Sequence, residues 1–140
     1  QIAGAVHVWI GADTTTPEDA TTTTDTGINS ETPNPPAIVT ATANAIVLAI
    51  GASTEVDVPT APTNYENLIE DQVAGAISNI MMASRAIASP ATENPGTFGR
   101  IAGANTDSWC AATVAIRALA GLAGHGLLLS HTRNKLVLVA

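Results

Sequence analysis

Residues 38–50, IVTATANAIVLAI, carry the clearest structural pattern in the chain. Before Asn44, threonine alternates with small apolar residues, and after it residues 46–50 are a continuous apolar run. Alternation by two is typical of a strand with one buried face. A short continuous apolar run is typical of a strand that is buried on both faces. The stretch therefore predicts two strand halves, separated at Asn44.

Two further segments alternate in the same way and are rich in β-branched residues. Residues 108–117, SWCAATVAIR, place Trp109, Ala111, Thr113, Ala115 and Arg117 opposite Cys110, Ala112, Val114 and Ile116. Residues 2–10, IAGAVHVWI, place Val6, Val8 and Ile10 on one side and Ala5, His7 and Trp9 on the other. Both segments are predicted to be strands.

The remaining strand signals are shorter. Residues 65–69 alternate, with Tyr65, Asn67 and Ile69 on one side, and residues 97–103 add another strand, followed by a turn at residues 105–107. Residues 68–89 fit a helical stripe, but also a strand after a turn at residues 74–75. The strand-like neighbours favour the strand.

Residues 11–37 are predicted to be a long loop. They hold eight threonines between Thr14 and Thr26, five acidic residues and four prolines. Such a composition offers no apolar face to bury. Loops of this length are usually functional or disordered.

These elements predict an all-β fold, an antiparallel β-sandwich of the jelly-roll or immunoglobulin-like type. Residues 1–117 form the sandwich domain, and residues 118–140 form a C-terminal extension that docks on a partner or adds a strand. The chain supplies six strands at most, whereas a sandwich needs about seven or more. Either another chain completes a sheet, or an N-terminal part is missing. The start at Gln1 indicates a processed or partial product.

Composition excludes several classes of protein. The chain has 140 residues, a net charge of −7 and only five basic residues, which argues against nucleic acid as a partner. No apolar stretch approaches the ~20 residues that a membrane span needs. The single cysteine, Cys110, excludes a disulfide framework and a multi-cysteine zinc site. It is expected to be a small buried hydrophobic residue.

No catalytic arrangement is visible, so we do not expect an enzyme. His7, His125 and His131 have no ligand or carboxylate at a catalytic or metal-binding spacing. Ser108 and Ser130 lie outside any Gly-x-Ser-x-Gly motif. The glycines of residues 121–126 lack the lysine and the preceding strand of a phosphate-binding loop.

The acidic residues of the predicted loop are candidates for ligand binding. Asp13, Glu18, Asp19 and Asp25 offer the oxygen ligands that calcium takes, but at no known motif spacing, so no cofactor is expected. A host-surface glycan is a second candidate ligand, because carboxylates hydrogen-bond sugar hydroxyls. The residues of that glycan site would be Trp9, Asp13, Asp19 and Asp25.

The C-terminal extension is apolar and basic, unlike the rest of the chain. Residues 1–107 carry all 12 acidic residues and two arginines, whereas Arg117, Arg133 and Lys135 follow without any acid. Two apolar runs flank the polar turn 130–135, and exposing them to water is costly. They are predicted to dock on a partner chain through Leu127, Leu128, Leu129, Leu136, Val137, Leu138 and Val139, with burial in their own domain as the alternative.

Four collinear stretches resemble the β-sandwich domains of phage virion proteins, of the minor tail, fibre or head-decoration type. The stretches are residues 6–20 (VHVWIGADTTTPEDA), 40–49 (TATANAIVLA), 62–65 (PTNY) and 109–117 (WCAATVAIR). The resemblance implies a β-sandwich fold and a virion context, and it implies no catalytic residues.

The expected function is therefore that of a non-enzymatic structural protein of a bacteriophage virion. It would decorate the head or tail through contacts with other virion proteins and with copies of itself, on the extracellular particle. The alternative is a carbohydrate-binding or adhesin module that contacts host-surface glycans.

Overall fold

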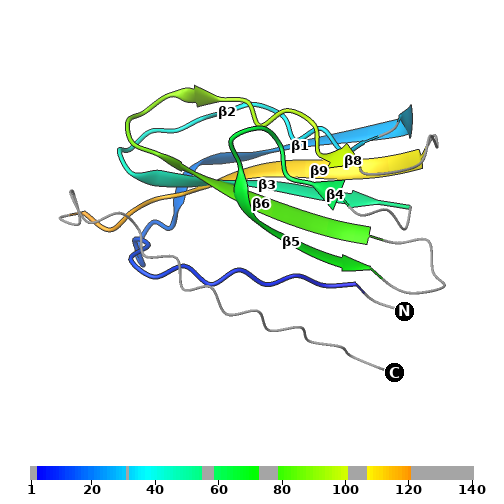
Figure 1. The fold of residues 1–140 in the computed structure, drawn as a ribbon. Helices are drawn as coiled ribbons and strands as arrows, with labels where there is room; N and C mark the ends of the chain where they lie inside the picture. Colours follow the sequence, from blue (N-terminus) through cyan, green and yellow to red (C-terminus); the bar gives the residue numbers. More distant parts are fainter. Residues whose placement is uncertain (1–2, 31, 55–58, 73–78, 101–106, 121–140) are drawn as a thin grey trace.

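The structure, a computed structural model, describes residues 3–30, 32–54, 59–72, 79–100 and 107–120. Within these residues the chain forms strands and no helix, which confirms the all-β prediction (Figure 1). The strands are β1 (Glu18–Ser30), β2 (Ile38–Val39), β3 (Ala45–Ser53), β4 (Pro59–Thr60), β5 (Glu66–Gln72), β6 (Asn79–Ile87), β7 (Thr92–Glu93), β8 (Gly99–Arg100) and β9 (Asp107–Ile116). Accordingly, the part of the chain that the structure describes has no helix able to cross a bilayer.

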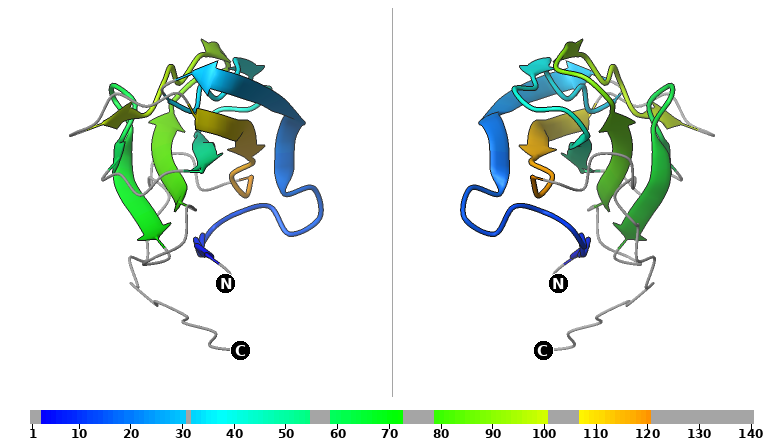
Figure 2. Two further views of the ribbon diagram at one scale, coloured as in Figure 1. Left: turned by 90° about the vertical axis from the view of Figure 1, so that its right-hand side faces the viewer. Right: turned by 90° about the vertical axis from the view of Figure 1, so that its left-hand side faces the viewer.

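One five-stranded antiparallel sheet dominates the fold, in the order β1-β9-β3-β6-β5. Two two-stranded sheets, β2-β7 and β4-β8, lie over one face of it (Figure 2). The core lies between these layers. The antiparallel, sandwich-like arrangement is thus confirmed, although the second layer consists of two short ribbons.

The split of residues 38–50 about Asn44 is confirmed. Strand β2 ends at Val39 and β3 begins at Ala45, with Asn44 at a φ of 60°. Asparagine tolerates this left-handed conformation better than other non-glycine residues. Residues Ile46 to Ala49 are buried, as predicted for a strand that is covered on both faces, while Ile50 is half-buried.

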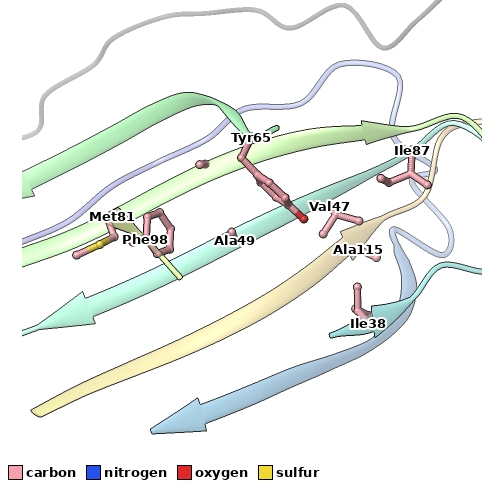
Figure 3. Packing of buried hydrophobic residues seen from close by; sticks show 9 residues of the cluster. Ile38, Val47, Ala49, Tyr65, Met81, Ile87, Phe98 and Ala115 are labelled. Carbon is pink, nitrogen blue, oxygen red and sulfur yellow. The ribbon is translucent and has the colours of Figure 1, made fainter. Parts of the chain in front are cut away.

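The core face of the sheet, which faces the short ribbons, supplies most of the hydrophobic cluster (Figure 3). Its buried members are Ile38, Val47, Ala49, Tyr65, Met81, Ala83, Ile87, Phe98 and Ala115. Phe98 is the largest side chain buried to below 2% exposure. Its backbone N–H donates to the Pro33 carbonyl at 3.0 Å. Both side chains lie close to Gly51. A Cβ at this position would lie 2.8 Å from the Cβ of Pro33 and 3.2 Å from Cδ2 of Phe98.

Alternation places a second set of apolar side chains on the other face of the sheet, here called the outer face. The set includes Ile46, Leu48, Ile50, Ile80, Met82 and Val114. Ile46 and Leu48 are buried, and the other four are half-buried. The sheet is therefore apolar on both faces.

Residues 68–89 form strands rather than a helix in their described part. Strand β5 pairs with β6, and the predicted turn at residues 74–75 lies outside the described residues. One detail of this region was wrong: Ile69 does not share a side with Tyr65. Asn67, at a φ of 56°, makes an irregularity in β5 that turns Leu68 toward the core and pairs Ile69 with Met82 of the outer face.

The prediction that residues 11–37 form a loop was wrong, because residues 18–30 form the 13-residue strand β1. Threonine is β-branched and favours strands. Strand β9 supplies the pairing partner, with Thr23 opposite Thr113 and Thr26 opposite Cys110. A polar strand of this kind is stable at the edge of a sheet because it needs only one neighbour.

The prediction of a strand over residues 2–10 was also wrong, because residues 3–8 belong to no strand. These residues form an extended segment on the outer face, on the far side of the sheet from β2 and β7 (Figures 1 and 2). A segment that crosses a face cannot join the ladder of that sheet. The predicted alternation holds, but with Val6, Val8 and Ile10 on the exposed side.

At the C-terminal end, β9 spans residues 107–116 and alternates as predicted, with Ala111, Thr113 and Ala115 buried. Cys110 is exposed, so the prediction of a buried cysteine was wrong. The register places it on the outer face, opposite Thr26 and Ala52. Of predicted strand 97–103, residues 99–100 form β8, and residues 101–106 lie outside the described part.

Candidate functional site

Asp19 on β1 is a buried carboxylate that joins three elements. It accepts hydrogen bonds from the backbone N–H of Ala41 at 2.6 Å, from the backbone N–H of Thr42 at 3.2 Å and from the Thr42 hydroxyl. The Arg117 Nε, just after β9, lies 3.5 Å from its Oδ1. The side chain of Asp19 is 0% exposed, so this carboxylate holds the turn between β2 and β3 against the sheet.

The environment of Asp19 favours its charged form. Burial alone raises the pKa of a carboxyl group. Hydrogen bonds from Thr42 and Ala41, with the charge of Arg117, outweigh burial and hold the pKa of Asp19 below its ordinary value. An ionised carboxylate whose lone pairs are filled by internal donors is a structural group, with little capacity left for an external ligand.

A second buried polar group lies under β7. Glu93 is 7% exposed and accepts hydrogen bonds from the Tyr65 hydroxyl at 3.2 Å and from Arg85 at 2.8 Å. Burial and the neighbouring Glu93 carboxylate raise the pKa of the Tyr65 hydroxyl, which stays protonated. The three side chains tie β7 to the segment before β5 and to β6.

The other acidic residues near β1 cap nearby backbone groups. Asp13 accepts from the N–H of Thr15 and Thr16 at 2.8 and 3.0 Å, and these bonds hold the pKa of Asp13 below its ordinary value. Glu18 accepts from the side chain and the N–H of Thr22 at 2.8 and 2.9 Å, and the pKa of Glu18 is lowered as a result.

Asp25 acts in the same way toward the next residue, accepting from the Thr26 N–H at 2.8 Å. Strand β1 is an edge strand, and Thr22 lies in its irregular stretch between Ala20 and Thr23. The N–H groups of Thr22 and Thr26 bond to carboxylates of their own strand, so part of the hydrogen-bonding capacity of this edge is already used.

The extended segment of residues 3–10 has two unlike sides. Ala5, His7 and Trp9 are half-buried, and the rings of His7 and Trp9 have centroids 5.6 Å apart. Val6, Val8 and Ile10 are 63%, 57% and 58% exposed. We call these three residues the N-terminal stripe. Alternation along an extended chain places them on the side that faces away from the sheet.

The four residues of the predicted glycan site do not form one binding surface. Trp9 lies on the outer-face segment, and Asp13 lies in the turn before β1 and binds Thr15 and Thr16. Asp19 is buried, and Asp25 is exposed on β1 opposite Ala111. Among the described residues, no group of three or more His, Cys, Asp and Glu side chains is placed to hold a metal ion.

The predicted partner-docking residues lie outside the described part of the chain. They are Leu127, Leu128, Leu129, Leu136, Val137, Leu138 and Val139. His125, His131, Ser130 and the glycines of residues 121–126 lie outside it as well.

The sequence analysis missed two features, the buried role of Asp19 and the exposure of the N-terminal stripe. The clamping role of Asp19 depends on a turn 22 residues away, and nothing in a run of threonines distinguishes this aspartate from Asp25. The N-terminal stripe follows from the predicted alternation, but the sequence alone does not show which side faces water.

A scan against protein-family models found no match, and searches of the curated proteins and of the solved structures found none either.

Proposed function

We propose that this chain is a non-enzymatic structural protein of a bacteriophage virion, which decorates the head or tail through contacts between chains. The family resemblance of residues 6–20, 40–49, 62–65 and 109–117 is the argument for the virion context. The single structural observation that supports assembly is the N-terminal stripe, an apolar surface on an acidic body.

The buried ionisable groups support a structural role. Asp19 holds the β2–β3 turn and Arg117, and Glu93 holds Tyr65 and Arg85. Catalytic groups normally face a cleft, with a capacity for proton transfer or ligand binding. Each of these two carboxylates is instead buried and binds groups of its own chain.

The apolar surface supports association with other chains. Scattered exposed apolar residues are common on soluble proteins, whereas apolar residues side by side mark contact sites. Val6, Val8 and Ile10 follow one another on the same side of one segment, and the chain carries no Asp, Glu, Lys or Arg between Gln1 and Ala12. Two copies with a net charge of −7 would meet most easily where charge is absent.

The two apolar runs of the C-terminal extension would supply the second contact of the proposed assembly. Docking by Leu127–Leu129 and Leu136–Val139 would be mainly hydrophobic. Burial of four such side chains contributes about 6–10 kcal/mol before ordering costs. Three basic side chains at a solvent-exposed contact contribute at most about 1 kcal/mol each. Attachment should therefore depend only weakly on salt.

The glycan-binding alternative has weaker support. Its acidic residues are engaged with backbone groups of their own chain, and Asp19 is buried. A glycan array with the purified chain tests it directly. Specific binding that is lost on Trp9→Ala or Asp25→Ala would favour a host-attachment function.

Density-gradient fractionation of particles of the phage that encodes the chain tests the proposed function. We expect the chain, followed by mass spectrometry, to co-sediment with DNA-filled particles and to stay with them at 1 M salt, a concentration at which the Debye length is about 3 Å. Recovery only in the soluble fraction of the lysate would contradict the proposal.

A further inference from the structure

We propose that the N-terminal stripe, Val6, Val8 and Ile10, receives the C-terminal run Leu136–Val139 of a second copy of the chain. The proposal rests on the assembly function proposed above and names the two surfaces that meet.

Any partner that covers the stripe must lie on the outside of the body. Val6, Val8 and Ile10 are each more than half exposed, whereas the alternate residues Ala5, His7 and Trp9 are half-buried. A strand hydrogen-bonded beside this segment would lie in its plane and would leave the outward side chains uncovered. Only a layer stacked on the outside, as in a sheet-on-sheet contact, covers them.

Hydrogen bonds hold both ends of the segment. The Gly4 N–H donates to the Asp71 carboxylate at 3.3 Å. At the other end, the Leu119 N–H donates to the Gly11 carbonyl at 2.8 Å, and Ala12 pairs with Ala118. The stripe thus lies on a fixed extended segment and is pre-organised to bind an extended partner.

The C-terminal run matches the stripe in pattern. Residues 136–139 read LVLV, and residues at every second position of an extended chain lie on one side. Such a run offers the stripe a row of aliphatic side chains with the same spacing of about 6.6–6.8 Å. Among the described residues, the apolar runs 45–50 and 80–83 are already in the sheet, and the other run of the C-terminal extension, Leu127–Leu129, is one residue shorter.

Charge favours the same pairing. Arg133 and Lys135 come directly before the run. The stripe is neutral, and acidic residues lie at both of its ends: Asp71 bonds to Gly4, and Asp13 follows Ala12. A basic group next to the run would therefore meet a carboxylate whichever way the strand runs.

The described chain ends beside the segment that carries the stripe. Ala118 pairs with Ala12, and the Leu119 N–H donates to the Gly11 carbonyl. Leu136 comes 17 residues after Leu119 in the sequence. A chain of that length can reach a neighbouring copy, and the proposal places the run on the stripe of that copy.

Disulfide trapping between two full-length chains tests the proposal. Both chains carry Cys110→Ser, because Cys110 is exposed. One carries Val8→Cys and an affinity tag, and the other carries Leu138→Cys. After mixing and mild oxidation, we expect a mixed dimer at about the summed mass of the two chains. The matched control is Val39→Cys, which is 63% exposed on β2, on the other side of the sheet. It should give at least tenfold less mixed dimer.

The other results of this experiment overturn the proposal in distinct ways. A disulfide formed only within a doubly substituted Val8→Cys, Leu138→Cys chain would show that the run covers its own stripe. Dimers of the Val8→Cys chain alone would show that two stripes meet each other. Mixed dimer in equal amounts with Val8→Cys and Val39→Cys would show random collision, and no mixed dimer would show no contact.

A second measurement does not depend on oxidation. Val8→Asp changes an exposed side chain, so the β-sheet signal in circular dichroism should be unchanged, whereas the oligomer seen by light scattering should dissociate. Val39→Asp should leave the oligomer intact. Equal behaviour of the two variants would overturn the proposal. Because both measurements use the purified chain, they can succeed even if the particle fractionation fails, which separates this inference from the virion function.

Discussion

The indole of Trp109 lies over Gly27, its direct partner across β1 and β9. A Cβ at Gly27 would lie 2.3 Å from Cε2 of the indole, a distance that no side chain accepts without movement. An aromatic ring that covers a glycine on the neighbouring strand packs against the backbone and helps to fix the register of the pair.

Gly27→Ala should therefore destabilise the fold by about 1–3 kcal/mol, since the indole must move. Urea unfolding followed by fluorescence in a Trp9→Phe background, with Trp109 as the remaining tryptophan, measures the change. Gly4→Ala is the control, because a Cβ there meets nothing within 4 Å. Equal stability of the two alanine variants would show that the indole does not hold this position.

Asp19 should make stability depend on pH. Its pKa is lower in the folded chain than its ordinary value of 3.8. A lowered carboxyl pKa stabilises the fold above the unfolded-state pKa, and this stabilisation is lost as the pH falls through the folded-state pKa. The wild-type chain should thus lose stability below about pH 4, more steeply than Asp19→Asn.

Denaturant unfolding of both chains between pH 7 and pH 2 gives the difference between their free energies of unfolding. Asp13 and Glu18 are present in both chains, so their contributions cancel in this difference. The asparagine variant should be less stable at pH 7, because the partner Arg117 loses its carboxylate, and the two curves should converge at low pH. Parallel curves would exclude Asp19 as the source of the pH dependence.

Glu18 and Asp25 should protect the edge of β1. Their carboxylates bind the N–H groups of Thr22 and Thr26, and exposed strand edges otherwise pair with other chains. The double variant Glu18→Ala, Asp25→Ala should self-associate more strongly, seen as increased light scattering and thioflavin T fluorescence.

The control for this edge is Glu66→Ala with Glu70→Ala on β5, which removes the same charge. That edge is interrupted at Asn67, which has a positive φ, so pairing with another strand should stay weak. Similar association of both double variants would indicate that lower net charge, rather than the freed N–H groups, drives it.

Phe98→Ala should cost about 3–5 kcal/mol, because Phe98 is 1% exposed and fills the space between Gly51, Pro33 and the sheet. Val39→Ala, at an exposed position, should change the free energy of unfolding by less than about 0.5 kcal/mol. Differential scanning calorimetry compares them. A small effect of Phe98→Ala would contradict the placement of the core.

The parts of the fold that the sequence predicted are those that local chemistry dictates. Asn44 breaks residues 38–50 because asparagine accepts a positive φ, and the apolar run after it can only be buried. The alternation of residues 108–117 likewise follows from the period of a strand. These features need no knowledge of the rest of the chain.

The errors arose where a distant partner decides the structure. The threonines of β1 form a strand because β9, about 85 residues away, pairs with them. Residues 3–8 alternate like a strand but cross a sheet face, where there is no free edge to join. Asp19 became a buried clamp because the turn at residues 41–42 offers three donors. The spacing of residues along the sequence does not show which distant residues come into contact.

The central claim, that the chain assembles through its apolar ends, is tested most directly by its mass in solution. Multi-angle light scattering at micromolar concentration should show an oligomer of the full chain, with little change between 0.1 and 1 M salt. The same chain without residues 121–140 should be a monomer, whereas Arg133→Ala with Lys135→Ala should stay oligomeric. A full-length chain that is monomeric at this concentration and unfolds cooperatively would contradict the claim.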